Sequence, residues 1–169
     1  NINYIECPVM GGPVQAEEGV LGGIVGGSDE NFKLGEPYLK MFCKDYFYFG
    51  PVGMGAKSKL LNNFLSLGNA ALVNHLAKTA TELGLDLQKV FDVAKLGSGN
   101  SAGLIRIFES LLKGDFKGFK FTATNSVKDL SYIQDLLKDF PEAEKVAEVN
   151  KNYFQKAVDD GYGESFISE

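Results

Sequence analysis

The chain has 169 residues, of which 44% are hydrophobic and 23% are charged, and its net charge is −5. These values are ordinary for a globular protein. The acidic balance and the single arginine, Arg106, argue against nucleic-acid binding, which needs a basic stripe with arginines. Two cysteines, Cys7 and Cys43, lack metal-ligand spacing, and the only histidine is His75. We therefore expect no metal site, reduced cysteines and a cytoplasmic location.

The first fifty residues carry the pattern of a small α/β unit. Short apolar or aromatic runs bounded by Gly and Pro predict three strands, at Asn3–Glu6, Gly19–Gly26 and Tyr46–Phe49. We expect the turn Gly11-Gly12-Pro13 after the first strand, and a helix that is capped by Ser28 and runs to about Phe42. Three strands bury too little surface to stand alone. We therefore expect them to complete a sheet whose earlier strands belong to a longer protein.

From about Lys57 onward the pattern predicts helices only. The first spans 57–83, and its stretch from Leu60 to Ala77 contains no Asp, Glu, Lys or Arg, which is typical of a buried helix. The asparagines in this stretch make it too polar for a membrane span. Four shorter helices follow. Asp86 should cap a helix at 87–96, and Ser101 should cap one that runs to about Lys113. The last two run from Thr124 or Asn125 to about Asp139 and from Pro141 to about Asp160, with a tail at 161–169.

Lys59 and Asn63 are the most informative pair of residues. They stand four positions apart in Gly53-Met54-Gly55-Ala56-Lys57-Ser58-Lys59-Leu60-Leu61-Asn62-Asn63, so on a helix both side chains leave the same face. Burial favours the neutral form of a lysine, which can exchange a proton with a substrate oxygen, and a neighbouring carboxamide can orient the ligand. Spacing alone leaves open a solvated lysine without a catalytic role.

Three motifs carry a family resemblance. Cys7-Pro8-Val9-Met10-Gly11-Gly12-Pro13 is similar to a substrate-binding Asp-Ala-Pro-Val-Ser-Gly-Gly. Gly53–Asn63 matches Gly-x-Gly-x-x-x-Lys-x-x-Asn-Asn at every fixed position, and Val127-Lys128-Asp129-Leu130 resembles a Lys-Asp-Leu segment. Together they resemble the β-hydroxyacid dehydrogenases, the family of 3-hydroxyisobutyrate dehydrogenase within the 6-phosphogluconate dehydrogenase superfamily.

The resemblance implies a mainly α fold in two parts. Residues 1–52 would be the last strands of a truncated α/β Rossmann-type domain, and residues 53–169 an all-helical substrate and oligomerisation domain. The whole enzyme would use NAD or NADP and form a homodimer or homotetramer. Because the chain lacks the Gly-x-Gly-x-x-Gly loop that anchors the pyrophosphate, we expect this piece alone to bind the cofactor poorly and to be inactive.

The resemblance also implies roles for particular residues. Lys59 would be the acid/base that exchanges the hydroxyl proton of a small hydroxy acid, and Asn63 would hold the same oxygen or the substrate carboxylate. Met10, Gly11 and Gly12 would bind the carboxylate. Met10 stands where the family carries a serine, and methionine cannot donate that serine's hydrogen bond. The identity of the hydroxy acid therefore stays open.

Two further residues have competing interpretations. Phe119 would line the substrate pocket, but an aromatic residue in a glycine-rich loop also serves packing. Lys128 would lie against the cofactor, but it could equally be a solvated residue in the first turn of a helix.

Several alternatives to this function remain at this point. One is a glyoxylate or succinic semialdehyde reductase of the same superfamily, and another is a non-catalytic helical dimerisation module. The retained Lys59 argues against the related imine reductases, which replace this lysine. Asn62-Asn63, in place of His-Asn, argues against 6-phosphogluconate dehydrogenase itself.

Overall fold

The computed structural model describes residues 2–169. They divide into two compact units, the first ending at Asn62 and the second spanning Asn63–Glu169. The first unit contains four strands, two short helices and the beginning of the long helix α3. Its elements are β1 (Ile5–Glu6), β2 (Val9–Met10), α1 (Pro13–Glu17), β3 (Leu21–Gly27), α2 (Asp29–Leu39) and β4 (Cys43–Tyr48), followed by α3 (Met54–Glu82).

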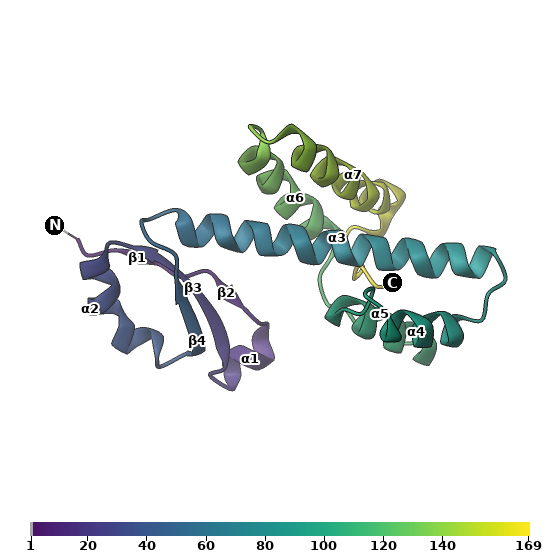
Figure 1. Cartoon of the computed structure of the whole chain (residues 1–169), viewed down its shortest axis with the longest axis horizontal. Helices are drawn as coiled ribbons and strands as arrows, with labels where there is room; N and C mark the ends of the chain where they lie inside the picture. The colour runs from purple at the N-terminus through teal and green to yellow at the C-terminus, as the bar shows by residue number, and fades with distance from the viewer. Residues whose placement is uncertain (1) are drawn as a thin grey trace. The chain divides into compact units, whose positions relative to one another are not determined.

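The sheet of the first unit is built around β3. Strands β1 and β2 pair with it antiparallel in one continuous register, in which Ile5 faces Gly27 and Met10 faces Gly22. Strand β4 pairs with it in parallel. Helix α2 contacts β1, β3 and β4 and connects β3 to β4 (Figure 1). The expected strand-helix-strand unit is therefore confirmed, as is Ser28, whose Oγ accepts the N–H of Asn31 at 3.2 Å.

Three details of the first unit differ from the sequence-based prediction. Strand β2 was not expected, because it has only two residues and directly follows Pro8. The predicted turn at Gly11-Gly12-Pro13 instead opens α1, with Gly12 as N-cap and Pro13 at the first helical position, where its missing N–H costs nothing. Helix α2 ends at Leu39, since the chain must turn before Cys43 enters β4 opposite Leu21.

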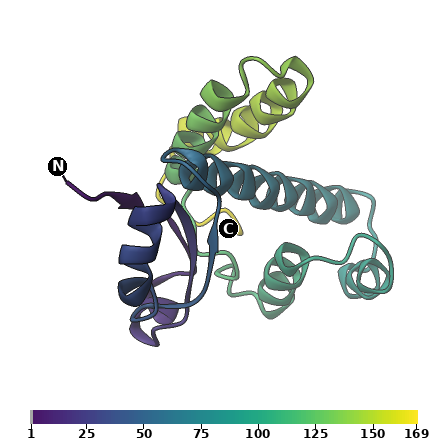
Figure 2. The same cartoon turned by 60° about the vertical axis from the view of Figure 1, so that its left-hand side comes forward.

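The second unit contains helices packed around one core. They are the main part of α3, then α4 (Leu87–Leu96), α5 (Ala102–Lys113), α6 (Ala123–Leu137), α7 (Pro141–Ala157) and the π-helical turn η1 (Val158–Tyr162). Helices α6 and α7 run side by side in both views (Figures 1 and 2). Asp86 and Ser101 cap α4 and α5 as predicted, whereas α6 is capped by Thr122 rather than starting at residue 124 or 125.

Helix α3 is less buried than its lack of charge predicts. Its buried apolar positions are mainly small residues: Leu67, Ala70, Ala71, Val73, Ala77 and Ala80. Four of its leucines are exposed, Leu61, Leu65, Leu72 and Leu76. A helix buries only the stripe that faces its neighbours, so an uncharged sequence does not by itself place every side chain in a core.

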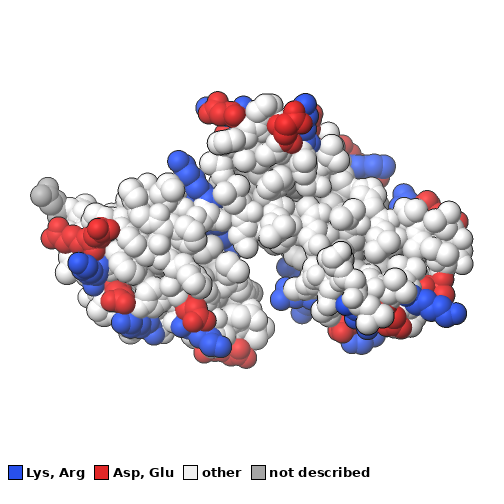
Figure 3. Space-filling view, in the orientation of Figure 1, with Lys and Arg blue, Asp and Glu red and all other residues white. Residues whose placement is uncertain are grey.

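Charged side chains of both signs are mixed on the face of the molecule drawn in Figure 3. Most of the ion pairs join residues three or four apart on one helix, such as Lys40 with Glu36 at 3.2 Å and Lys156 with Asp160 at 2.7 Å. Exposed pairs of this kind contribute only about 0–1 kcal/mol each. Stability therefore depends on the apolar cores. Among residues 2–169, no helix combines the length and the apolar character that crossing a membrane requires.

The core of the helical unit gives a direct stability test. Phe108 is fully buried, and its ring stacks on Phe91 with centroids 5.4 Å apart. We expect Phe108→Ala to lower the free energy of unfolding by about 3–5 kcal/mol, because it removes apolar contacts and leaves a cavity. Leu96→Ala is the control, since Leu96 is 90% exposed, and should change it by less than about 0.5 kcal/mol. Urea titration followed by circular dichroism measures both. Equal effects would contradict this core.

Candidate active site

The beginning of α3 is fixed by a residue from β1. The Oε1 atom of Glu6 accepts the backbone N–H groups of Gly53 and Gly55, both at 2.8 Å, and of Ala56 at 3.2 Å. The first N–H groups of a helix have no partner within the helix, and they attract negative charge. Glu6 therefore supplies three of these missing partners with one carboxylate oxygen, and it joins the strand to the helix that carries Lys59.

A steric constraint explains why position 55, the second glycine of the Gly-x-Gly motif, is a glycine. A β-carbon at this position would lie 2.7 Å from the carbonyl oxygen of Ile24 and 2.9 Å from the backbone nitrogen of Gly26. Such distances to fixed backbone atoms are prohibitive. The first turn of α3 can therefore approach β3 and accept the Glu6 cap only because residue 55 has no side chain.

The expected carboxylate-binding residues follow β2. Met10 ends this strand and is 43% exposed, while Gly11 has φ +112°, a conformation that favours glycine. The backbone N–H of Gly12 donates to Oε1 of the exposed Gln15 side chain at 2.8 Å. Gln15 thus accepts the hydrogen bond of the same N–H group that is expected to bind a substrate carboxylate. A carboxylate that used the Gly12 N–H would have to displace this exposed amide.

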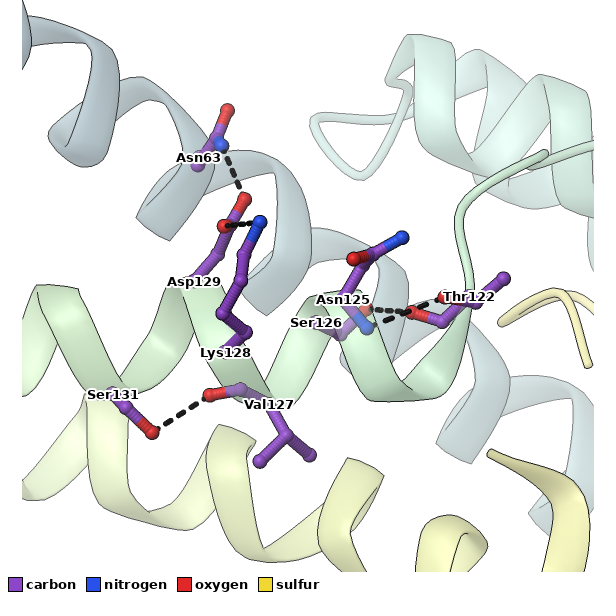
Figure 4. Close-up of polar contacts among 8 residues, drawn as sticks. All are labelled: Asn63, Thr122, Asn125, Ser126, Val127, Lys128, Asp129 and Ser131. Atoms are coloured by element: carbon purple, nitrogen blue, oxygen red, sulfur yellow. Dashed lines mark hydrogen bonds and ion pairs between the residues drawn. The ribbon is translucent and has the colours of Figure 1, made fainter. Parts of the chain in front are cut away.

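Lys59 and Asn63 both lie on α3, one helical turn apart, and both are half-buried. Lys59 belongs to the second turn of the helix, beyond the N–H groups that Glu6 caps. Asn63 opens the second unit. Its Nδ2 donates to Oδ2 of Asp129 on α6 at 2.8 Å, so the orientation of its carboxamide is set by a carboxylate (Figure 4).

Asp129 is the functional candidate that the sequence analysis did not single out. It is 9% exposed, and its second oxygen, Oδ1, lies 3.2 Å from Nζ of Lys128, whose side chain is 53% exposed (Figure 4). A buried carboxylate is costly unless it is paired and hydrogen-bonded. Asp129 meets both conditions, since it accepts from Asn63 and pairs with Lys128.

A signal for Asp129 was present in the sequence. The buried residues of α6 follow a helical period, with Asp129 in the series: Ser126, Asp129, Leu130, Ile133 and Leu137. A charged residue on an otherwise apolar helical stripe indicates a specific partner, here Asn63.

The loop that contains Phe119 is held by the C-terminal segment, which the sequence analysis treated as a tail. The hydroxyl of Ser168 accepts the N–H of Phe119 at 3.1 Å and donates to the carbonyl oxygen of Phe116 at 2.9 Å. Ser168 and its neighbour Ile167 are buried. Residues 167–168 are therefore part of the helical core and fix the backbone next to Phe119.

The structure thus brings Asn63, Lys128 and Asp129 into direct contact within the second unit, to which Phe119 also belongs. Met10, Gly11, Gly12 and Lys59 belong to the first unit, together with the Glu6 cap. Within the described range, no three His, Cys, Asp or Glu side chains are grouped so that they could hold a metal ion.

Comparison with known sequences assigns the family. Residues 53–168 match the family described as NAD-binding of NADP-dependent 3-hydroxyisobutyrate dehydrogenase. The chain belongs to this 3-hydroxyisobutyrate dehydrogenase family. Residues 1–50 match the family described as the NAD binding domain of 6-phosphogluconate dehydrogenase. The expected family is thereby confirmed for the chain, and so is a mainly helical fold with a small sheet.

Individual members of the family are distant relatives. The chain is 31% identical over 118 residues to 2-(hydroxymethyl)glutarate dehydrogenase of Eubacterium barkeri, which covers 69% of this chain and 39% of that protein. The crystal structure of 3-hydroxyisobutyrate dehydrogenase from Salmonella typhimurium superimposes with a TM-score of 0.85 at 25% identity, over 98% of this chain and 58% of that one. Psf3 in complex with NADP+ and 2-OPP gives 0.77 at 27% identity, over 98% and 57%. The chain therefore spans roughly half the length of these relatives.

The Glu6 cap predicts a graded loss of stability. Glu6→Ala leaves three N–H groups without their acceptor, and we expect the free energy of unfolding to fall by about 1–3 kcal/mol. Glu6→Gln keeps an oxygen but removes the negative charge from the helix N-terminus, and should cost about 0.3–1 kcal/mol. The exposed Glu18→Ala serves as a control without effect. Chemical denaturation of the three variants measures the order, and a loss for Glu6→Ala no larger than for Glu18→Ala would contradict the cap.

Proposed function

We propose that residues 1–169 are the C-terminal part of an NAD(P)-dependent dehydrogenase that interconverts a small β-hydroxy acid and its semialdehyde. The observation that carries this proposal is the arrangement of the Lys59/Asn63 motif. Lys59 lies one turn from a carboxamide that a buried carboxylate holds in place, within the segment that matches the dehydrogenase family. Residues 1–52 would complete the dinucleotide-binding domain, and residues 53–169 would form the helical substrate domain.

Lys59 is proposed as the acid/base. Oxidation of a hydroxy acid removes a proton from the hydroxyl oxygen and a hydride from the carbon that carries it. Neutral Lys59 would accept this proton, and protonated Lys59 would return it during reduction of the semialdehyde. Its half-buried position on α3, one helical turn from Asn63, supports this role.

Asn63 is proposed to hold the reacting oxygen next to Lys59. One N–H of its carboxamide is committed to Asp129, which fixes the side chain and determines which way its oxygen points. The amide retains a second N–H and a carbonyl oxygen with which to contact a substrate. A ligand-orienting group must be held to within about 0.5 Å, and the charged partner Asp129 supplies this restraint.

Lys128 is proposed to contact the cofactor. Its half-exposed side chain presents a cation whose position is set by Asp129, and this fits a contact with a polar or anionic group such as a dinucleotide. When bound, the nicotinamide supplies the hydride acceptor. The pyrophosphate anchor would come from a Gly-x-Gly-x-x-Gly loop outside residues 1–169.

Met10, Gly11 and Gly12 are proposed to receive the substrate carboxylate, with Phe119 lining the pocket. Met10 offers no hydroxyl, so the contact would rest on backbone N–H groups, after displacement of the Gln15 amide from Gly12. The partly exposed thioether of Met10 favours an apolar substituent next to the carboxylate over a polar one.

The role of Lys59 is tested by Lys59→Ala in the complete protein. We expect hydroxy-acid oxidation to fall by at least about three orders of magnitude, because the proton acceptor is lost, while the circular dichroism spectrum is unchanged. Lys57→Ala, two residues earlier on the exposed side of the same helix, is the matched control and should keep kcat. A Lys59→Ala enzyme with near-normal kcat would contradict the mechanism and would favour a non-catalytic helical module.

The role of Asp129 is tested by Asp129→Asn. This change keeps the size of the side chain but removes the charge that orients Asn63 and Lys128, and we expect kcat/KM to fall about tenfold or more, equivalent to about 1.4 kcal/mol. Asp135→Asn, on the exposed face of the same helix, should have no effect. If Asp129 had only a structural role, thermal stability would fall while kcat/KM of the folded enzyme stayed unchanged.

A further inference from the structure

The two cysteines of the chain, 36 positions apart in sequence, meet in the first unit. A β-carbon on Gly23 would lie 3.0 Å from Sγ of Cys43 and 3.1 Å from Sγ of Cys7. Both sulfurs therefore share the space above one backbone position of β3, and they can do so because residue 23 has no side chain. Sequence spacing did not reveal this pair, since the sheet, and not a local motif, brings the thiols together.

The two thiols lie in a partly buried environment. Burial raises the pKa of Cys7 to about 11, and the nearby Cys43 adds to the rise. Burial also raises the pKa of Cys43. Cys43 is buried, whereas Cys7 is half-buried, so the pair can be reached from the side of Cys7.

A direct disulfide does not fit this geometry. Cys7 lies between β1 and β2, which pair with one edge of β3, and Cys43 lies in β4 on the other edge. Two strand spacings separate the backbones by about 9.5 Å, whereas a disulfide needs Cα atoms within about 7 Å. A single atom placed between the sulfurs removes this mismatch, because two metal–sulfur bonds of about 2.3 Å each extend the reach of the side chains.

We propose that Cys7 and Cys43 form a binding site for one thiophilic, two-coordinate metal ion of the Cu(I) class, held between the two sulfurs above Gly23. Two thiols provide too few ligands for tetrahedral zinc, but soft thiolate ligands select Cu(I). Binding would replace two S–H bonds by two metal–sulfur bonds and release two protons, without any change in oxidation state. The ion would join both edges of β3, and it would therefore stabilise the first unit.

Competition with the chromophoric chelator bicinchoninate tests the site. Under anaerobic conditions, the chain should withdraw one Cu(I) ion from the chelator complex, and its unfolding temperature should rise. Cys7→Ser and Cys43→Ser should each abolish the withdrawal and the rise in temperature. Met41→Leu is the matched control, because Met41 is an exposed soft ligand two residues before Cys43, and this change should alter neither result.

A second variant tests the geometry without removing a thiol. Gly23→Ala would place a methyl group where the two sulfurs meet, so we expect Cu(I) affinity to fall at least tenfold while both thiols still react with a thiol reagent in the unfolded chain. The proposal is overturned if the wild-type chain withdraws no ion, if either single serine variant retains full affinity, or if one ion is bound per two chains. Unchanged affinity in a folded Gly23→Ala variant would overturn it as well.

Discussion

A single carboxylate oxygen of Glu6 fixes the beginning of α3. The directions in which Lys59 and Asn63 leave the helix depend on that starting point. Three backbone N–H groups converge on this oxygen, and the approach is open only because residue 55 is a glycine. Lys59 follows in the next turn and Asn63 one turn later. A shift of the helix start by one residue would rotate both side chains by about 100°. The Gly-x-Gly part of the motif is therefore a constraint on geometry, although neither glycine carries a reactive group.

A second acid performs a related task in the helical unit. Asp129 is buried, and its two oxygens are committed to Asn63 and Lys128. Removing a carboxylate from water is costly, so the charge is retained only where its partners repay the desolvation. Here both partners are residues that the family motifs single out. This supports a role for Asp129 in positioning them, because simple packing of α6 against α3 would be served as well by an apolar residue at this position.

Much of the fold followed from local sequence signals. Ser28, Asp86 and Ser101 were identified as helix caps because their side chains satisfy N–H groups close in sequence. The sequence-based predictions were wrong where contacts with residues distant in sequence determine the local structure. Strand β2 exists only because β3 pairs with it, and the terminal segment is ordered because Ser168 contacts the loop at Phe119. The exposed leucines of α3 are a further example. The sequence alone does not tell which face of an uncharged helix packs against other helices.

The candidate site likewise has features that follow from the sequence and features that only the structure reveals. The placement of Lys59 and Asn63 on one helix face follows from helical periodicity, and the structure adds what periodicity lacks, the Asp129 partner of Asn63. Oε1 of Gln15 already accepts the N–H of Gly12. A carboxylate that binds to this loop must therefore compete with an intramolecular acceptor for that N–H. Binding there gains only the difference between two hydrogen bonds, which is small for neutral acceptors and larger for a charged one. At this position a fully ionised carboxylate would therefore compete better than an aldehyde or ester oxygen, as the proposed hydroxy-acid substrate requires.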